Sequence, residues 1–123
     1  MSASALFLAV LGTAITFLPQ ELLTHVGVQP TGVPVLLIQV LGALYFGFAI
    51  VNWMNRGNRI GGIYNRPVSM ANFFHFGVGA VSLLKGAAAQ FTPEVAVAAA
   101  IYSIFGIWFG LVLFTHPAEK TAA

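Results

Sequence analysis

Five polar side chains within apolar stretches of this chain could bind a ligand or move a proton. They are Tyr45, Asn52, Asn72, His75 and Ser82. The first two lie in segment 34–55 and the others in segment 67–85, at spacings of three and seven residues that share one helical face. Apolar surroundings offer such groups no hydrogen bonds, so they must find partners inside the protein. The spacing predicts that the two faces meet around a ligand-binding site.

The same residues have a plainer interpretation. Interhelical Asn, Ser and His commonly act as hydrogen-bond glue, contributing about 0.6 kcal/mol per contact. His75 could instead donate a proton or ligate haem, but we expect His25 and His116 near opposite membrane surfaces, away from it. One chain is therefore not expected to supply two haem ligands. We assign no catalytic residue and no metal ligand, and the sequence leaves the cofactor unknown.

Three arginines in the stretch RGNRIGGIYNR form a second candidate site. They are Arg56, Arg59 and Arg66. Guanidinium groups, with backbone N–H groups exposed by the glycines between them, suit the phosphate of a lipid headgroup or another anionic ligand. Short cytoplasmic loops are also generally basic, so membrane topology alone explains these arginines equally well.

The composition indicates whether water or lipid surrounds this protein. Of the 123 residues, 59% are hydrophobic and 7% charged, against about 25% charged in a soluble domain. We therefore expect an integral membrane protein. The formal charge of +2 is too slight for a nucleic-acid partner. Without cysteine there is no disulfide or thiol chemistry.

Hydropathy predicts an all-α fold, an integral membrane four-helix bundle forming a single domain over residues 1–123. The helices are expected at about 2–18, 34–55, 67–85 and 94–115. Pro19 ends the first helix, and Thr92 and Pro93 provide a cap and a first helical residue for the fourth.

The basic loop indicates the orientation of these helices. Placing its arginines inside the cell puts both termini on the cytoplasmic side, and only Lys85 opposes the rule. The first outer connection, residues 20–32, has apolar residues around Glu21 and His25, which favours a short helix lying in the membrane interface.

Small residues and tryptophans are expected to serve packing and anchoring. Small residues line faces on the first and fourth helices, Ala5 and Ala9 on one, Gly106 and Gly110 on the other, and predict close helix contacts. The pair Gly106 and Gly110 could alternatively mediate dimerisation. Trp53 is interpreted as an interface or lipid-facing anchor.

Several activities lack the residues they need. The three carboxylates, Glu21, Glu94 and Glu119, all lie at or beyond predicted helix ends, so no helix carries the central acid expected of an ion-coupled exporter. There is likewise no plausible Ser-His-Asp set, no paired carboxylate site and no Walker-type loop.

The run FLPQELLTHVGVQPTGVPVLLIQVLGALYFGFAIVN, residues 17–52, resembles the first half of the DoxX-like group of small four-helix bacterial membrane proteins. The shared features are a Pro-containing helix end, a short outer segment with glycine, and a Gly-rich second helix. The resemblance implies a four-helix bundle in the bacterial inner membrane and, for some relatives, association with quinone-linked redox enzymes. It places no functional residue on this sequence.

Three functions follow as expectations. The favoured one is a non-catalytic subunit or lipid- or quinone-binding module, with membrane lipids and a hydrophobic small molecule or quinone as partners. The alternatives are a small-solute or ion transporter or channel assembled from several copies, and a membrane oxidoreductase component using His75. In each case we expect a homo-oligomer or a larger membrane complex.

Overall fold

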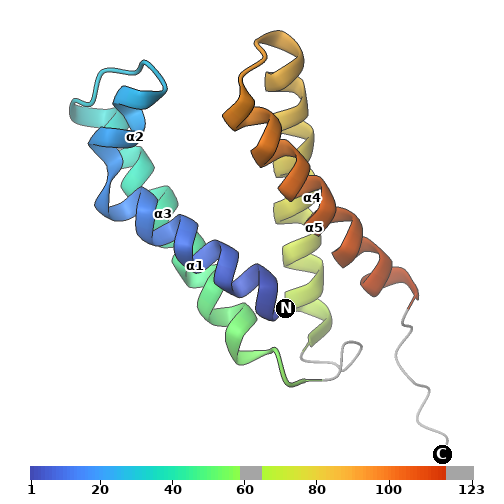
Figure 1. Ribbon diagram of the computed structural model, residues 1–123. Helices are drawn as coiled ribbons and strands as arrows, with labels where there is room; N and C mark the ends of the chain where they lie inside the picture. Colours follow the sequence, from blue (N-terminus) through green and yellow to red (C-terminus); the bar gives the residue numbers. More distant parts are fainter. Residues whose placement is uncertain (59–64, 116–123) are drawn as a thin grey trace, which may run out of the picture. The chain divides into compact units, whose positions relative to one another are not determined.

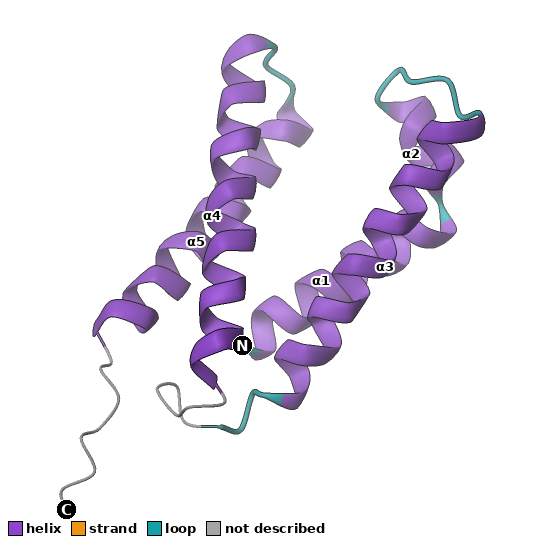
Figure 2. Cartoon of the chain, turned by 180° about the vertical axis from the view of Figure 1, so that it is seen from behind, coloured by secondary structure: helices purple, strands orange, loops and turns teal. Residues whose placement is uncertain are grey.

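The computed structural model describes residues 1–58 and 65–115, and every regular element in those ranges is an α-helix (Figures 1 and 2). The helices are α1 (Ser2–Phe17), α2 (Pro19–His25), α3 (Gly32–Met54), α4 (Asn65–Ala89) and α5 (Pro93–Thr115). They form two compact units, Met1–Gly57 and Asn58–Ala123, hereafter unit 1 and unit 2. The single-domain expectation stays a prediction.

The four long helices lie where hydropathy predicts them, with shifts at some ends. α3 begins at Gly32, two residues before the expected start, because Gly32 adopts a φ of +53° that turns the chain into the helix. α4 continues past Gly86 to Ala89. The helix-stopping effect of one glycine, about 1 kcal/mol, is overcome by the three alanines that follow it.

The start of α5 has the predicted cap. The side-chain oxygen of Thr92 accepts a hydrogen bond from the backbone N–H of Val95, over 3.4 Å. Pro93 occupies the first helical position, where its missing N–H costs nothing. Glu94 follows in the first turn, where a carboxylate interacts favourably with the positive end of the helix.

The expected short helix after the first span is α2. Its axis turns by 91° from that of α1 at Leu18 and Pro19. Pro19 and Leu23 are buried, whereas Gln20 and Glu21 are exposed, so the helix has an apolar and a polar face. Gly27, with a φ of +79°, lies in the turn after its last residue.

In unit 1, α1 and α3 pack as an antiparallel pair (Figure 1). Gly12 and Gly42 allow the two backbones to approach, since a Cβ added to Gly12 would lie 2.9 Å from the carbonyl oxygen of Gly42. Leu8, with no exposed surface, and Ala49, 4% exposed, are among the buried apolar residues of this unit.

In unit 2, α4 and α5 pack around aromatic rings. Phe76 is fully buried and stacks on Phe109, with 5.9 Å between ring centroids and 4° between ring planes. Gly106 lies against the backbone of Gly77. A Cβ added to Gly106 would lie 3.4 Å from the Cα atom of Gly77. The small-residue face of the fourth predicted helix therefore contacts α4 within the same chain.

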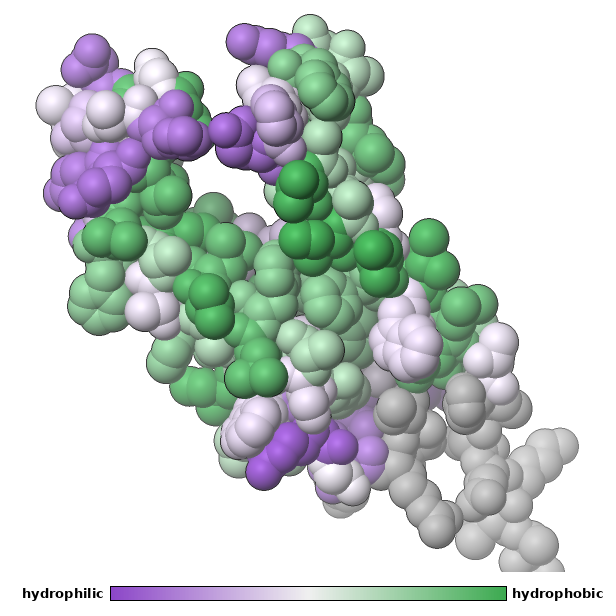
Figure 3. Space-filling model, in the orientation of Figure 1, coloured by the Kyte–Doolittle hydropathy of each residue, from purple (hydrophilic) through white to green (hydrophobic). Residues whose placement is uncertain are grey.

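Apolar side chains also cover the outside of the helices. Leu36 and Leu37 on α3, and Ile104 and Ile107 on α5, are each at least 60% exposed. Figure 3 shows hydrophobic residues over the middle of unit 1 and hydrophilic residues at its ends. Three described helices, α3, α4 and α5, are long and apolar enough to cross a membrane, and a fourth crossing is added if the bent pair α1 and α2 counts as one span.

Candidate functional site

The five polar residues predicted to form one site divide between the two units. Tyr45 is half-buried and Asn52 fully buried on α3, in unit 1. Asn72, His75 and Ser82 lie on α4, in unit 2. The predicted meeting of these two sets therefore stays a prediction.

Within α4, two of the three predicted polar residues bond to their own helix. The amide nitrogen of Asn72 donates to the carbonyl oxygen of Val68 over 2.8 Å, and Asn72 is fully buried. The hydroxyl of Ser82 donates to the carbonyl of Val78 over 3.0 Å, and Ser82 is exposed. Of these two residues on the predicted polar face of α4, Asn72 is therefore buried and Ser82 is not.

His75 is half-buried beside Tyr102. The centroids of the two rings lie 5.6 Å apart, and the imidazole also packs on Phe76 at 4.9 Å. Tyr102 in turn covers Gly79, where an added Cβ would lie 2.6 Å from a ring carbon. The missing side chain of Gly79 therefore leaves room for the Tyr102 ring.

Asn52 takes part in a buried hydrogen-bond chain that the sequence did not suggest. Its amide nitrogen donates to the hydroxyl of Ser4 over 3.2 Å, and that hydroxyl donates to the carbonyl of Met1 over 2.8 Å. Ser4 and Asn52 are 48 residues apart and both essentially unexposed. This chain ties the start of α1 to the end of α3.

Two further buried polar residues extend the face of Asn72 on α4. Asn65 and Ser69 precede it by seven and three residues and, like it, are at most 1% exposed. The Asn65 amide donates to the carbonyl of Asn58 over 3.2 Å. The Ser69 hydroxyl has no hydrogen-bond partner among the residues that the structure describes. Neither Asn65 nor Ser69 is among the candidate site residues that the sequence predicts.

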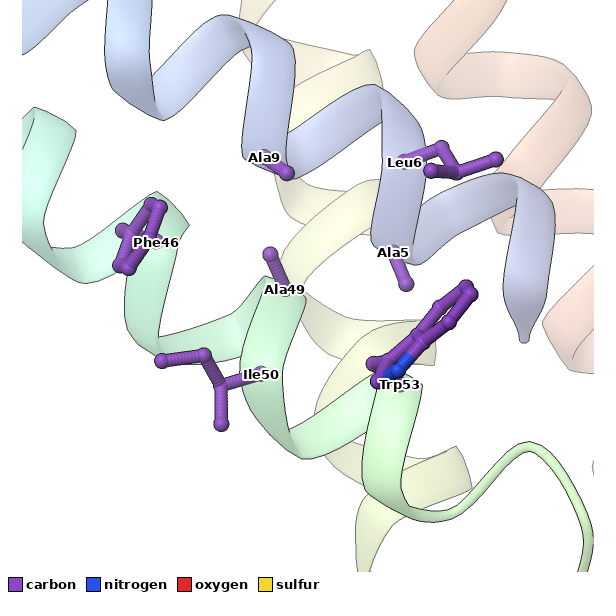
Figure 4. Close-up of a pocket in the computed structure, with 7 residues that line it drawn as sticks. All are labelled: Ala5, Leu6, Ala9, Phe46, Ala49, Ile50 and Trp53. Carbon is purple, nitrogen blue, oxygen red and sulfur yellow. The ribbon is translucent and has the colours of Figure 1, made fainter.

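Unit 1 has a groove between α1 and α3. Its volume is about 230 Å³. It is lined by Ala5, Leu6, Ala9, Phe46, Ala49, Ile50 and Trp53 (Figure 4). The three alanines point into the space between the helices, and Phe46 and Trp53 stand at its two ends (Figure 4).

The lining of this groove is almost wholly hydrocarbon. Among the seven side chains, only Trp53 carries a hydrogen-bonding group, its indole N–H. Leu6, Phe46 and Ile50 are between 48% and 58% exposed, so the groove opens on the outer surface of unit 1. These seven side chains include no acid, base or nucleophile.

Three of the lining residues have other roles in the sequence-based interpretation. Ala5 and Ala9 were interpreted as helix contacts and Trp53 as an anchor. The signal that could have revealed the groove is the four-residue spacing of Ala5 and Ala9 opposite Ala49, with Phe46 and Trp53 on either side.

The predicted anion site is only partly described. Arg56 is exposed just after α3, and its guanidinium lies over the Trp53 ring, 3.9 Å from the ring centroid. Arg66 is exposed in the first turn of α4, in unit 2. Arg59 lies outside the described residues. Within residues 1–58 and 65–115, no three His, Asp or Glu side chains gather in a way that could hold a metal ion.

Over residues 1–58 and 65–115 the protein is all-helical, with helices apolar enough to cross a membrane and a hydrocarbon-lined groove on one helix pair. Comparisons of the chain with protein-family models, curated proteins and solved structures find no match.

Proposed function

We propose that this protein is a non-catalytic module of the bacterial inner membrane that holds the hydrocarbon chain of a lipid in the groove between α1 and α3. The observation that carries the proposal is the groove itself. A space of about 230 Å³ lined by seven mainly apolar side chains lies on an outer surface that is itself rich in exposed apolar side chains.

The shape of the groove favours a single chain. Its volume is below the roughly 300–1,000 Å³ of sites that enclose a drug-sized molecule. Phe46 and Trp53, at its ends, are seven residues apart on α3, which corresponds to about 10 Å along the helix axis. A narrow space of this length accommodates part of one acyl chain lying along the helices.

The chemistry of the lining favours an acyl chain over a quinone ring. The two carbonyl oxygens of a quinone call for hydrogen-bond donors, and burying them without donors costs free energy. The lining supplies one donor, the Trp53 indole N–H. An acyl chain has no polar atom to leave unsatisfied, so it matches this lining better.

The proposal includes a topology of four membrane crossings. α3, α4 and α5 supply three, and α1 supplies the fourth, with α2 lying in the outer interface. Arg56 and Arg66 support a cytoplasmic position for the connection between α3 and α4, which places both termini on that side. The sequence resemblance to the DoxX-like group agrees with this arrangement.

Filling the groove tests the proposal. Ala9 lines it and is half-buried, so Ala9→Phe would occupy the space with limited disturbance of the helix contact. Ala43 on the same helix pair is exposed and does not line the groove, so Ala43→Phe is a matched control. Native mass spectrometry of each protein, released gently from detergent, would measure both bound lipid and oligomer mass.

We expect wild type and Ala43→Phe to carry lipid adducts of defined mass, and Ala9→Phe to lose them. Equal lipid retention by all three proteins would refute the groove as the binding site. An adduct with the mass of a quinone, lost in Ala9→Phe, would assign the groove to the other class of hydrophobic ligand.

A further inference from the structure

We propose that the lipid held by the groove is an anionic phospholipid whose phosphate is bound by Arg56. The inference rests on the proposed function and adds the chemical class of the headgroup. It starts from the position of Trp53, which both lines the groove and carries the guanidinium of Arg56 over its ring. The cation therefore lies at one end of an apolar, chain-sized space.

Two contacts hold the Arg56 side chain in this position. Its Nη1 donates to the carbonyl oxygen of Trp53 over 2.6 Å, and its guanidinium carbon lies 3.9 Å from the centroid of the indole ring. A guanidinium has five N–H donors, so most remain available for another acceptor. An oriented fork of donors matches two phosphate oxygens better than a flexible ammonium group would.

The charge of Arg56 is not neutralised within unit 1. The only acidic residue in residues 1–58 is Glu21. Glu21 lies in α2, at the opposite end of α3, a helix of 23 residues that rises about 34 Å. Among the residues that the structure describes, no carboxylate pairs with Arg56. A headgroup phosphate would provide the missing negative charge.

The spacing between cation and groove identifies a lipid, and not a free anion, as the occupant. Arg56 follows Trp53 by three residues, about one helical turn, so a headgroup at Arg56 continues directly into a chain along Trp53 and Phe46. A zwitterionic lipid would bring its own ammonium group close to the guanidinium, whereas phosphatidylglycerol carries a phosphate and uncharged hydroxyls. We therefore expect a preference for phosphatidylglycerol.

A competition between headgroups tests this inference. The full-length protein would be equilibrated with equal amounts of phosphatidylglycerol and phosphatidylcholine carrying identical chains, and the bound lipids weighed by native mass spectrometry. We expect wild type to favour phosphatidylglycerol by about tenfold, the ratio given by about 1.4 kcal/mol. Arg56→Gln should bring the ratio close to one while total lipid binding persists. Arg56→Lys, which keeps the charge but loses the fork, should give an intermediate ratio.

The control variant is Lys85→Gln. It removes an exposed positive charge near the C-terminal end of α4, in unit 2. It should leave the ratio unchanged. A ratio unaffected by Arg56→Gln would overturn the inference, as would displacement of phosphatidylglycerol by inorganic phosphate alone. If wild type binds both lipids equally and Ala9→Phe loses both, the headgroup assignment fails while the proposed function stands. If wild type retains neither lipid, the proposed function itself fails.

Discussion

Gly12 on α1 and Gly42 on α3 bring the two backbones of unit 1 into direct contact. A Cβ added to Gly42 would lie 2.9 Å from the backbone nitrogen of Thr16 and 3.0 Å from the carbonyl oxygen of Gly12. Because lipid drives helices together only weakly, such close backbone packing is a main source of helix association in membranes. This contact fixes how α1 crosses α3 and hence where the groove opens.

Gly42→Ala should therefore destabilise unit 1. The added methyl group meets backbone atoms that cannot rotate away, so we expect the free energy of unfolding to fall by about 1–3 kcal/mol. Gly47→Ala on the same helix is the control, since its Cβ would have no atom within 4 Å. It should be neutral or slightly stabilising, through helix propensity alone. Unfolding in mixed micelles with increasing SDS measures the change in free energy of unfolding for each variant. Equal changes in the two variants would show that the contact between Gly12 and Gly42 does not stabilise unit 1.

The hydrogen bond between Ser4 and Asn52 should contribute modestly to stability. A double-mutant cycle with Ser4→Ala and Asn52→Leu is expected to give a coupling energy of about 0.6 kcal/mol, and no more than about 1.7. The two residues lie on different helices, so the same SDS titration reports their coupling directly. A coupling energy of zero would show that the contact does not hold α1 to α3.

Single cysteines can test the four-crossing topology, because the chain has none of its own. Gln29→Cys and Gln90→Cys place exposed thiols in the two connections proposed to face outward, and Asn58→Cys places one in the proposed cytoplasmic connection. In spheroplasts, a membrane-impermeant maleimide should label the first two and leave the third unlabelled until the membrane is permeabilised. Labelling of Asn58→Cys in intact spheroplasts would reverse the orientation.

The variant Asn72→Leu/His75→Leu should retain bound lipid. The groove belongs to unit 1, whereas Asn72 and His75 lie on α4 in unit 2. Native mass spectrometry should therefore show the same adducts as wild type, with circular dichroism confirming the helical content. Loss of the adduct in this variant, but not in Ala9→Phe, would show that the ligand binds at the polar residues of α4 and not in the groove.

Local sequence features predicted the helices well and the candidate site poorly. The Thr92 cap and the break at Pro19 are properties of a few neighbouring residues, and the structure contains both. The hydrogen-bond partner of Asn52 lies 48 residues away at Ser4, and no local pattern points to it. Ser82 lies on the same predicted helical face as Asn72, but Ser82 is exposed and Asn72 is buried. The spacing of residues along one helix does not show how much of that face a neighbouring helix covers.

Apolar helices suited to a membrane could be predicted from the sequence, because hydropathy is a property of each continuous helical segment and prolines and capping residues act on their immediate neighbours. The groove at Ala5, Ala9 and Ala49, with Trp53 and Arg56 at its end, could not be predicted in this way, because it depends on how two separate helices pack. Alanine is small wherever it occurs. Whether it closes a helix contact or opens a space depends on the crossing of α1 and α3, which the glycine contact between them sets.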